Sequence, residues 1–265
     1  MYFTRPVILQ FALRKPFGIH SPFCYDFASK CIFSDEKPLD TSFIENQRKK
    51  FLNNKSNIEV IDFGKGIRFV KTRNNNEPLR YERKVGDIAR GSLQSKRMCA
   101  MLYRTIRYFA PKTILELGTS LGITTAYLAK AAPQAKLITL EGCPQTASLA
   151  ENFFRESGLG NIELIRGDFR KTLPGVINKL KAIDLAYIDG GHTYEGLMNN
   201  FNAIREHISE SSVLIIDDIR WSAEMKKAWL EIAAHSQATL CVDMFRLGIV
   251  FFKKGLSKQI IPVAF

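Results

Sequence analysis

The sequence predicts an α/β protein with a doubly wound, mostly parallel sheet. Between residues 113 and 216, short apolar runs alternate with helical runs, which is typical of βαβ units. Three of the apolar runs are followed directly by an acidic residue, at Glu141, Asp189 and Asp217. The last two apolar runs, residues 239–245 and 247–253, are joined so tightly that they predict an antiparallel hairpin at the end of the sheet.

The stretch from Thr113 to Ala132 predicts a buried strand, a glycine turn and a helix in succession. Gly118 and Gly122 bracket the turn, where they let the backbone approach a ligand, and the helix start offers unpaired N–H groups. A tight strand-to-helix turn without a ligand is the alternative. Glu116 favours a ligand, because a carboxylate inside an apolar strand is costly unless it has a partner such as a ribose hydroxyl or an ammonium group.

The next predicted strand, residues 136–140, ends on Glu141. In doubly wound sheets, an acidic residue about 20 positions after the glycine turn accepts hydrogen bonds from ribose hydroxyls. Glu141 occupies that place and is therefore a candidate nucleotide ligand.

Four motifs give the chain a specific resemblance. They are ELGTSLGITTAYLA, LITLEG, NIELIRGDFRKTLP and YIDGGHTYEG. Together they resemble the class I S-adenosylmethionine-dependent methyltransferases, above all the metal-dependent small-molecule O-methyltransferases of the catechol and macrolide-sugar type. The resemblance covers residues 92–254 and implies a Rossmann-like methyltransferase sheet, in which the C-terminal hairpin supplies the reversed strand.

The resemblance implies S-adenosylmethionine as cofactor and a set of residues that bind it. Asp168, after the third strand, matches the residue that contacts the adenine amino group, although it could instead cap the following helix. Gln94, near the start of the helical pattern that begins at Ser92, is a further contact by the same analogy. The expected cofactor-binding residues are Glu116, Gly118, Ser120, Gly122, Glu141, Asp168 and Asp189.

The ends of the fourth and fifth strands, residues 184–188 and 213–216, predict a metal site. Asp189 follows one strand, and Asp217 and Asp218 follow the other, at the edge where ligands bind in open α/β sheets. Three neighbouring carboxylates repel one another, and oxygen ligands suit Mg²⁺ or another hard divalent cation. Metal-dependent relatives carry Asp-Asn or Glu-Asp at the second place, so Asp-Asp is a departure. Alternatively, Asp189 caps the next helix, Asp217 orients its loop and no metal binds.

His192 lies three residues after Asp189. At this place the catechol-type enzymes carry a lysine base and the macrolide-sugar enzymes a histidine, so the resemblance implies that His192 takes the proton of the acceptor hydroxyl, with Asp189 as the second catalytic residue. A structural role is the alternative for a lone histidine. Trp221 is expected either beside the acceptor or in the core.

Residues 1–91 are expected to form an N-terminal extension or cap, and residues 92–265 the methyltransferase domain. The first 33 residues predict an ordered extension with short helices that packs on the catalytic domain or on a second subunit of a homodimer; a peripheral membrane contact through Phe3, Val7, Ile8 and Phe11 is the alternative. Residues 58–63 and 67–70, around Gly64-Lys65-Gly66, predict a hairpin. Residues 71–90 are charged and predict a mobile loop.

Composition predicts a soluble, cytoplasmic protein. The chain has 265 residues, of which 46% are hydrophobic, and no stretch is long enough to span a bilayer or has the pattern of a signal peptide. Its five cysteines are scattered and predict reduced thiols. The net charge is +12, and residues 1–91 hold 17 Lys/Arg against 10 Asp/Glu, which contributes +7.

Three functions remain open at this stage. The leading interpretation is a metal-assisted O-methyltransferase that acts on a small molecule. The second, suggested by the basic N-terminal third, is a methyltransferase of RNA or another anionic polymer; it is not favoured, because the fourth strand ends in DGGH rather than in the Asn/Asp-Pro-Pro-aromatic turn of enzymes that methylate exocyclic amines. The third is a non-catalytic cofactor-binding scaffold.

Overall fold

One eight-stranded sheet forms the middle of the protein. The computed structural model describes residues 13–63 and 78–265. The strands of the sheet are β3 (Thr113–Leu117), β4 (Lys136–Glu141), β5 (Ile162–Arg166), β6 (Ile183–Ile188), β7 (Ile208–Ile216), β8 (Leu240–Asp243), β9 (Gly248–Phe251) and β10 (Gln259–Pro262). Their order is β10-β8-β9-β7-β6-β3-β4-β5.

The predicted doubly wound sheet is confirmed. All neighbouring pairs are parallel except those of β9, which runs antiparallel to both β7 and β8. The predicted C-terminal hairpin is thus the β8–β9 pair, and β9 is the reversed strand. β10 adds a parallel edge strand that the sequence pattern did not reveal.

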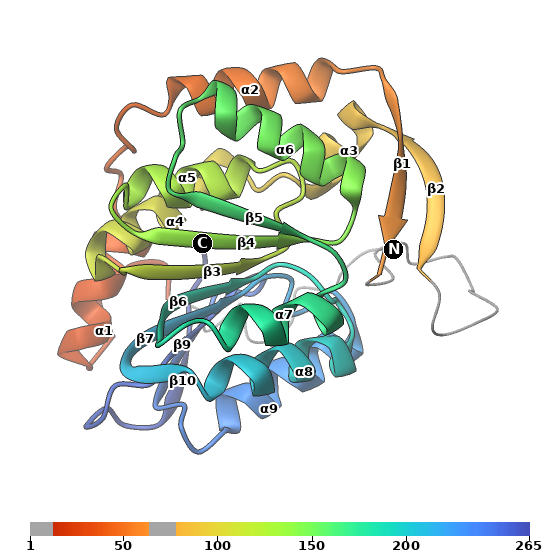
Figure 1. The fold of residues 1–265 in the computed structure, drawn as a ribbon. Helices are drawn as coiled ribbons and strands as arrows, with labels where there is room; N and C mark the ends of the chain where they lie inside the picture. The colour runs from red at the N-terminus through yellow and green to blue at the C-terminus, as the bar shows by residue number, and fades with distance from the viewer. Residues whose placement is uncertain (1–12, 64–77) are drawn as a thin grey trace.

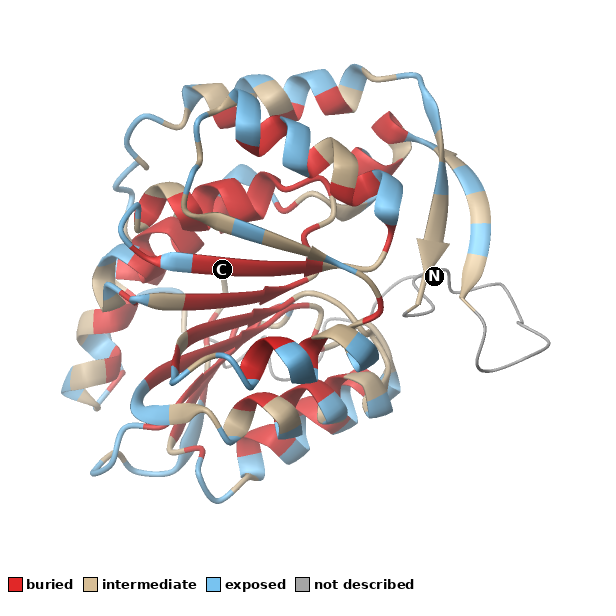
Figure 2. Cartoon of the chain, viewed as in Figure 1, coloured by how far each residue is buried: buried red, intermediate tan, exposed pale blue. Residues whose placement is uncertain are grey.

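Helices cover both faces of the sheet (Figure 1). They are α1 (Pro22–Phe27), the π-helix η2 (Ala28–Ile32), α2 (Ser42–Asn53), α3 (Val85–Ser92), α4 (Lys96–Phe109), α5 (Ile123–Ala131), α6 (Pro144–Glu156), α7 (Phe169–Ile177), α8 (Tyr194–Arg205) and α9 (Ala223–Ala234). Strand residues alternate between two cores: Ile114 packs with α1, α2, α4, α5 and α6, whereas Leu115 packs with α7, α8 and α9. Figure 2 shows the result, a sheet buried on both sides.

A break between α3 and α4 positions Gln94. The helical pattern was expected to run on from Ser92, but α3 ends at this residue and α4 begins at Lys96. The hydroxyl of Ser95 accepts a hydrogen bond from the backbone N–H of Met98, which caps the new helix. Gln94 lies in the break, and its side chain is buried.

The described part of the N-terminal extension packs on the main sheet. The ring of Phe27, in α1, lies 5.7 Å from that of Phe109 and 5.2 Å from that of Phe251, measured between centroids. The backbone of Leu13 also extends the sheet edge, because its N–H donates to the carbonyl of Pro262 at 3.0 Å and its carbonyl accepts from Ala264 at 2.9 Å. These contacts fulfil the expectation of an ordered extension on the catalytic domain; the division into domains at residue 91 stays a prediction.

The expected loop at residues 71–90 is wrong from residue 79 onward. β1 (Asn57–Asp62) pairs antiparallel with β2 (Leu79–Lys84), and α3 follows immediately. The strand was hidden in the sequence because both of its faces carry charge, and a two-stranded ribbon with a solvated face tolerates that composition. The predicted partner at residues 67–70, the Gly64-Lys65-Gly66 turn and the N-terminal residues 1–12 lie outside the described residues.

None of the helices in residues 13–63 and 78–265 combines the length and the apolar character that a bilayer-spanning segment needs. All five cysteines are buried free thiols. This agrees with the expectation of reduced cysteines.

We expect Gly122→Ala to destabilise the fold more than Gly158→Ala. Both glycines have a left-handed backbone, with φ of 78° and 65°, so the conformational cost of a side chain is shared. A Cβ at Gly122 would lie 2.6 Å from the ring of Phe154, whereas a Cβ at Gly158 meets no atom within 4 Å. The overlap should cost about 1–3 kcal/mol more in the free energy of unfolding, measured by urea denaturation. Equal losses in the two variants would contradict this packing.

Candidate functional site

The predicted site residues converge at the carboxyl edge of the sheet, where the loops after β3, β4, β6 and β7 meet (Figure 1). Two of these loops touch directly. Gly118 has a φ of 106°, and a Cβ there would overlap the carbonyl oxygen of Asp189. The glycine therefore lets the loop after β3 approach the loop after β6; its predicted contact with a ligand remains a prediction.

Glu116 is fully buried in β3. Its Oε2 accepts hydrogen bonds from the hydroxyls of Thr125 and Thr139, both at 2.6 Å. Its Oε1 has no hydrogen-bond partner among the described residues. Burial raises the pKa of Glu116 to about 7, against the opposing effect of the two threonine hydroxyls. The protein thus supplies hydrogen-bond partners for Oε2, whereas Oε1 can still accept a hydrogen bond from a ligand.

Glu141 organises the turn after β3. Its Oε2 accepts from the backbone N–H of Ser120 at 2.7 Å, and its Oε1 from the N–H of Cys143 at 2.8 Å. Burial raises the pKa of this carboxyl above its ordinary value. Ser120 has a φ of 49°, and its hydroxyl lies 3.1 Å from that of Ser92 at the end of α3. Each carboxylate oxygen keeps acceptor capacity, which is consistent with the predicted ribose contact.

Asp168 caps α7, which confirms the alternative role predicted for this residue. Its carboxylate accepts from the backbone N–H of Arg170 at 3.0 Å and forms an ion pair with the guanidinium of the same residue at 2.6 Å. Burial alone would raise the pKa of Asp168, but these hydrogen bonds outweigh it and hold the pKa below its ordinary value. The predicted adenine contact would have to share this carboxylate.

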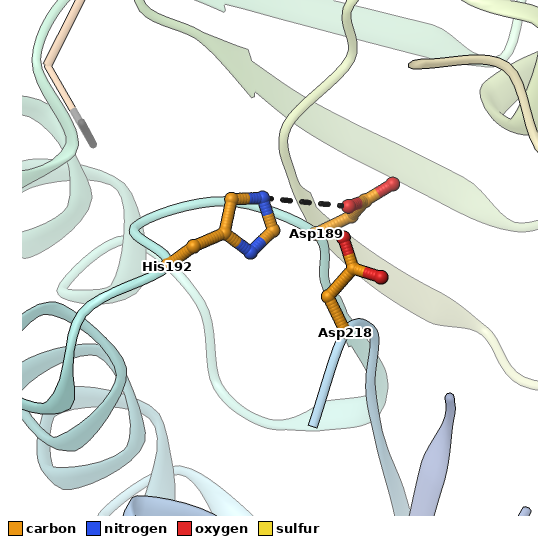
Figure 3. A group of neighbouring side chains, drawn as sticks. All are labelled: Asp189, His192 and Asp218. Carbon is orange, nitrogen blue, oxygen red and sulfur yellow. Dashed lines mark ion pairs between the residues drawn. The ribbon is translucent and has the colours of Figure 1, made fainter. Parts of the chain in front are cut away.

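Asp189, His192 and Asp218 form the cluster shown in Figure 3, in which one potential ligand atom from each lies within 4.8 Å of the others. His192 Nε2 is 3.9 Å from Asp189 Oδ1, which is too long for a hydrogen bond. Its Nδ1 is buried and has no hydrogen-bond partner among the described residues. Asp189 does not cap α8, because the hydroxyl of Thr193 does so by accepting from the N–H of Gly196. That alternative for Asp189 is therefore wrong.

Asp217, the third predicted metal ligand, lies deeper than this cluster. Its side chain is buried, and Oδ2 accepts from the Gln94 amide and, at 3.4 Å, from the Tyr187 hydroxyl. The same hydroxyl lies 3.3 Å from Asp189 Oδ2. Burial is the main cause that raises the pKa of Asp189 to about 7 and that of Asp217 to about 8, and the neighbouring carboxylates add to it.

Arg246 is a cation that sequence reasoning missed. It lies in the turn between β8 and β9, and its Nε is 3.4 Å from Asp217 Oδ1 and 3.2 Å from Asp218 Oδ1. Its charge opposes the rise in the pKa of Asp189 and Asp217. Only the sheet topology brings this turn beside β7, so no local signal could have identified it. Tyr187 could have been found, since it lies two positions before Asp189 on the same strand face.

Arg48 links the N-terminal third to the site. This buried side chain of α2 donates from Nη1 to the backbone carbonyl of Gln94 at 2.6 Å and from Nη2 to the Cys99 sulfur at 3.4 Å. It also forms an ion pair with Glu45 at 2.9 Å. Because the Gln94 amide in turn donates to Asp217, the orientation of the site depends on α2.

Trp221 stands beside His192, with 6.2 Å between the ring centroids. It is partly exposed rather than fully buried. The ring also packs against the core on the α7–α9 side of the sheet, so a place beside the acceptor stays a prediction.

The sheet order, the glycine turn after β3 and the acidic residues at the ends of β4, β6 and β7 define a class I methyltransferase fold. Residues 115–219 match the family model of a methyltransferase domain, which confirms the predicted resemblance to methyltransferases; its metal-dependent part stays a prediction. This part of the chain is therefore similar to a methyltransferase domain.

Two curated relatives are O-methyltransferases. O-methyltransferase hkm8 of Aspergillus hancockii is 29% identical over 144 residues, which are 52% of this chain and 56% of that protein. The human transmembrane O-methyltransferase is 38% identical over 77 residues, 28% of this chain and 26% of that protein. The chain thus spans about half the length of the first relative and about a quarter of the second.

Solved structures share the fold. The methyltransferase PaMTH1 of Podospora anserina, bound to S-adenosylhomocysteine, superimposes with a TM-score of 0.59 and 14% identity over 89% of this chain and 97% of that one. An O-methyltransferase of Bacillus cereus in complex with the same molecule gives a TM-score of 0.53 and 20% identity over 60% of this chain and 83% of that one.

We expect Glu116→Gln to remove a pH dependence of stability. A carboxyl whose folded pKa is about 7 binds its proton more tightly in the folded than in the unfolded protein, so its contribution is complete below about pH 4.5 and is lost as the pH rises through about 7. The free energy of unfolding of the wild type should therefore fall relative to the variant between pH 5 and pH 8, by on the order of 3 kcal/mol. Parallel urea-unfolding profiles at the two pH values would contradict this.

Proposed function

We propose that the protein transfers a methyl group from S-adenosylmethionine to a hydroxyl group of a small molecule. The observation that carries this proposal is the group of Asp189, His192 and Asp218 beside the turn after β3, at the edge of the sheet where open α/β folds bind ligands. The matched methyltransferase domain and the O-methyltransferase relatives support the reaction class. The buried free thiols support a cytoplasmic location.

The cofactor supplies a sulfonium-activated methyl group when it is bound. The turn at residues 118–122 and the carboxylates of Glu116 and Glu141 would hold it at the ends of β3 and β4, where Glu116 Oε1 is still without a partner among the described residues. The remaining task of the protein is to hold an oxygen in line with the methyl group and to accept its proton.

His192 is the proposed base, and Asp189 its partner. The buried Nδ1 and the 3.9 Å separation between Nε2 and Asp189 Oδ1 leave the imidazole without a hydrogen bond to the described residues. Nε2 is the nitrogen proposed to take the proton of an acceptor hydroxyl, and the Asp189 carboxylate beside it would stabilise the protonated ring. Trp221 would form one wall for the acceptor.

A divalent cation fits part of this site. Asp189 and Asp218 would supply carboxylate oxygens and His192 a nitrogen; when bound, the cation would lower the pKa of an acceptor hydroxyl. Two features limit the fit. His192 cannot serve both as ligand and as base, and Arg246 already lies within ion-pair distance of Asp217 and Asp218. Mg²⁺ would therefore compete with a guanidinium for the same carboxylates.

The first test is calorimetric titration with S-adenosylhomocysteine, followed by methyl-transfer assays with a panel of catechols, diols and sugars. We expect His192→Ala to bind S-adenosylhomocysteine as the wild type does but to lower kcat by about 10²–10⁴-fold, because the proton acceptor is lost. His207→Ala is the matched control, since this residue lies at the opposite end of β6, where its carbonyl accepts from Ile183. Undiminished transfer by the His192 variant would exclude His192 as the base.

We expect Arg246→Gln to bind Mg²⁺ or Mn²⁺ about tenfold more tightly than the wild type, because the competing charge is removed; this equals about 1.4 kcal/mol. Calorimetric titration of metal-stripped protein measures it directly. Arg246→Lys keeps the positive charge and should stay close to the wild type. If neither the wild type nor Arg246→Gln takes up metal, the metal-assisted form of the proposal fails, while methyl transfer itself is still tested by the assay above.

A further inference from the structure

A cavity lies beside α4, and none of its lining residues belongs to the site described above. Its volume is about 570 Å³, which is within the range of small-molecule pockets. Three segments enclose it: residues 14–16, residues 32–38 and one face of α4. The lining residues are Arg14, Lys15, Pro16, Ile32, Phe33, Ser34, Asp35, Glu36, Lys37, Pro38, Arg97, Ala100 and Arg104.

The lining of this cavity is strongly basic. It has five basic and two acidic side chains, a formal balance of +3. None of the five basic side chains forms an ion pair with a carboxylate among residues 13–63 and 78–265, although Asp35 and Glu36 line the same cavity. Residues 1–12, which precede the cavity in the chain, contain no aspartate or glutamate. The two carboxylates of the lining therefore offset only part of its positive charge.

Arg104 makes this imbalance costly, because only 8% of its surface is exposed. Its Nε donates to the carbonyl of Cys31 at 3.0 Å, and its Nη1 to the carbonyl of Glu36 at 2.7 Å. Both acceptors are neutral, and Nη2 has no hydrogen-bond partner among the described residues. Burial lowers the pKa of Arg104; Cys31 and the acidic Glu36 and Asp35 oppose this shift, and the charge of Arg97 adds to it. A buried guanidinium whose direct hydrogen bonds go only to neutral carbonyls favours the binding of an anion.

Arg97 gives the cavity a second guanidinium. It lies over the ring of Phe265, 4.3 Å from the centroid, in a cation–π contact. Arg97 and Arg104 are two turns apart on the same helix, and the small side chain of Ala100 lies between them in the cavity lining. Paired guanidinium groups match the oxygens of a phosphate, to which each can donate two hydrogen bonds.

We propose that this cavity binds a small organic phosphate. Arg97 and Arg104 bind the phosphate group, Lys37 contributes at the rim, and the apolar part of the ligand packs against Phe33 and Pro38. The proposal does not depend on the methyltransferase activity, because none of its residues belongs to the catalytic edge.

The test is calorimetric titration of the full chain with phenyl phosphate at low salt, both without and with S-adenosylhomocysteine. Phenol and inorganic phosphate are titrated in parallel. We expect saturable binding at one site for phenyl phosphate, weaker binding of inorganic phosphate and none of phenol. Arg97→Gln should weaken phenyl phosphate binding at least about tenfold, whereas the matched control Arg155→Gln, an exposed residue of α6, should leave it unchanged.

Arg104→Gln should weaken binding further, and its thermal unfolding shows whether the buried site stays folded; the exposed Arg97 keeps the test valid if it does not. Absence of saturable binding up to about 10 mM overturns the proposal. So does equal affinity in the wild type and Arg97→Gln. Binding of a short single-stranded RNA without binding of phenyl phosphate also overturns it, in favour of a polyanion surface.

Discussion

Mutual repulsion of carboxylates at one sheet edge is the constraint that the rest of this structure satisfies. Parallel strands end in acidic residues at the same edge, and burial there makes each negative charge costly. The protein offsets this repulsion with hydrogen-bond donors and a cation. They are Gln94 from the break before α4, Tyr187 from β6 itself and Arg246 from the β8–β9 turn. A site that could bind a ligand is thus held together before any ligand arrives.

The central part of the fold could be predicted because its signals are local. Apolar runs long enough for buried strands, the glycines of the turn after β3 and the acidic strand ends all lie within short segments, and the structure places them where the pattern indicated. The pairing of Asp189 with His192 in one cluster could also be predicted, since the two residues are three positions apart.

The rest could not be predicted because it depends on contacts between distant segments. Arg246 meets Asp217 only through the insertion of β9 beside β7, and Arg48 meets Gln94 across 46 positions of sequence. β2 was missed for a different reason: its alternating charges are compatible with a solvated ribbon as well as with a loop. The sequence allowed Asp168 either to contact a ligand or to cap α7, and it does not fix the backbone geometry that decides between them. In the structure the carboxylate caps the helix.

The hydrogen bond from Arg48 to the carbonyl of Gln94 makes α2 part of the structure that supports the acidic sheet edge. A substitution in α2 can therefore alter the position of the acidic side chains although α2 does not contact them, because Arg48 acts through Gln94. The sequences of α2 and of the sheet edge are consequently constrained together. A chimeric protein that joined this sheet to the N-terminal segment of another protein with the same fold would need an equivalent buried cation in that segment. The segment that could be exchanged between such proteins therefore includes α2 as well as residues 115–219.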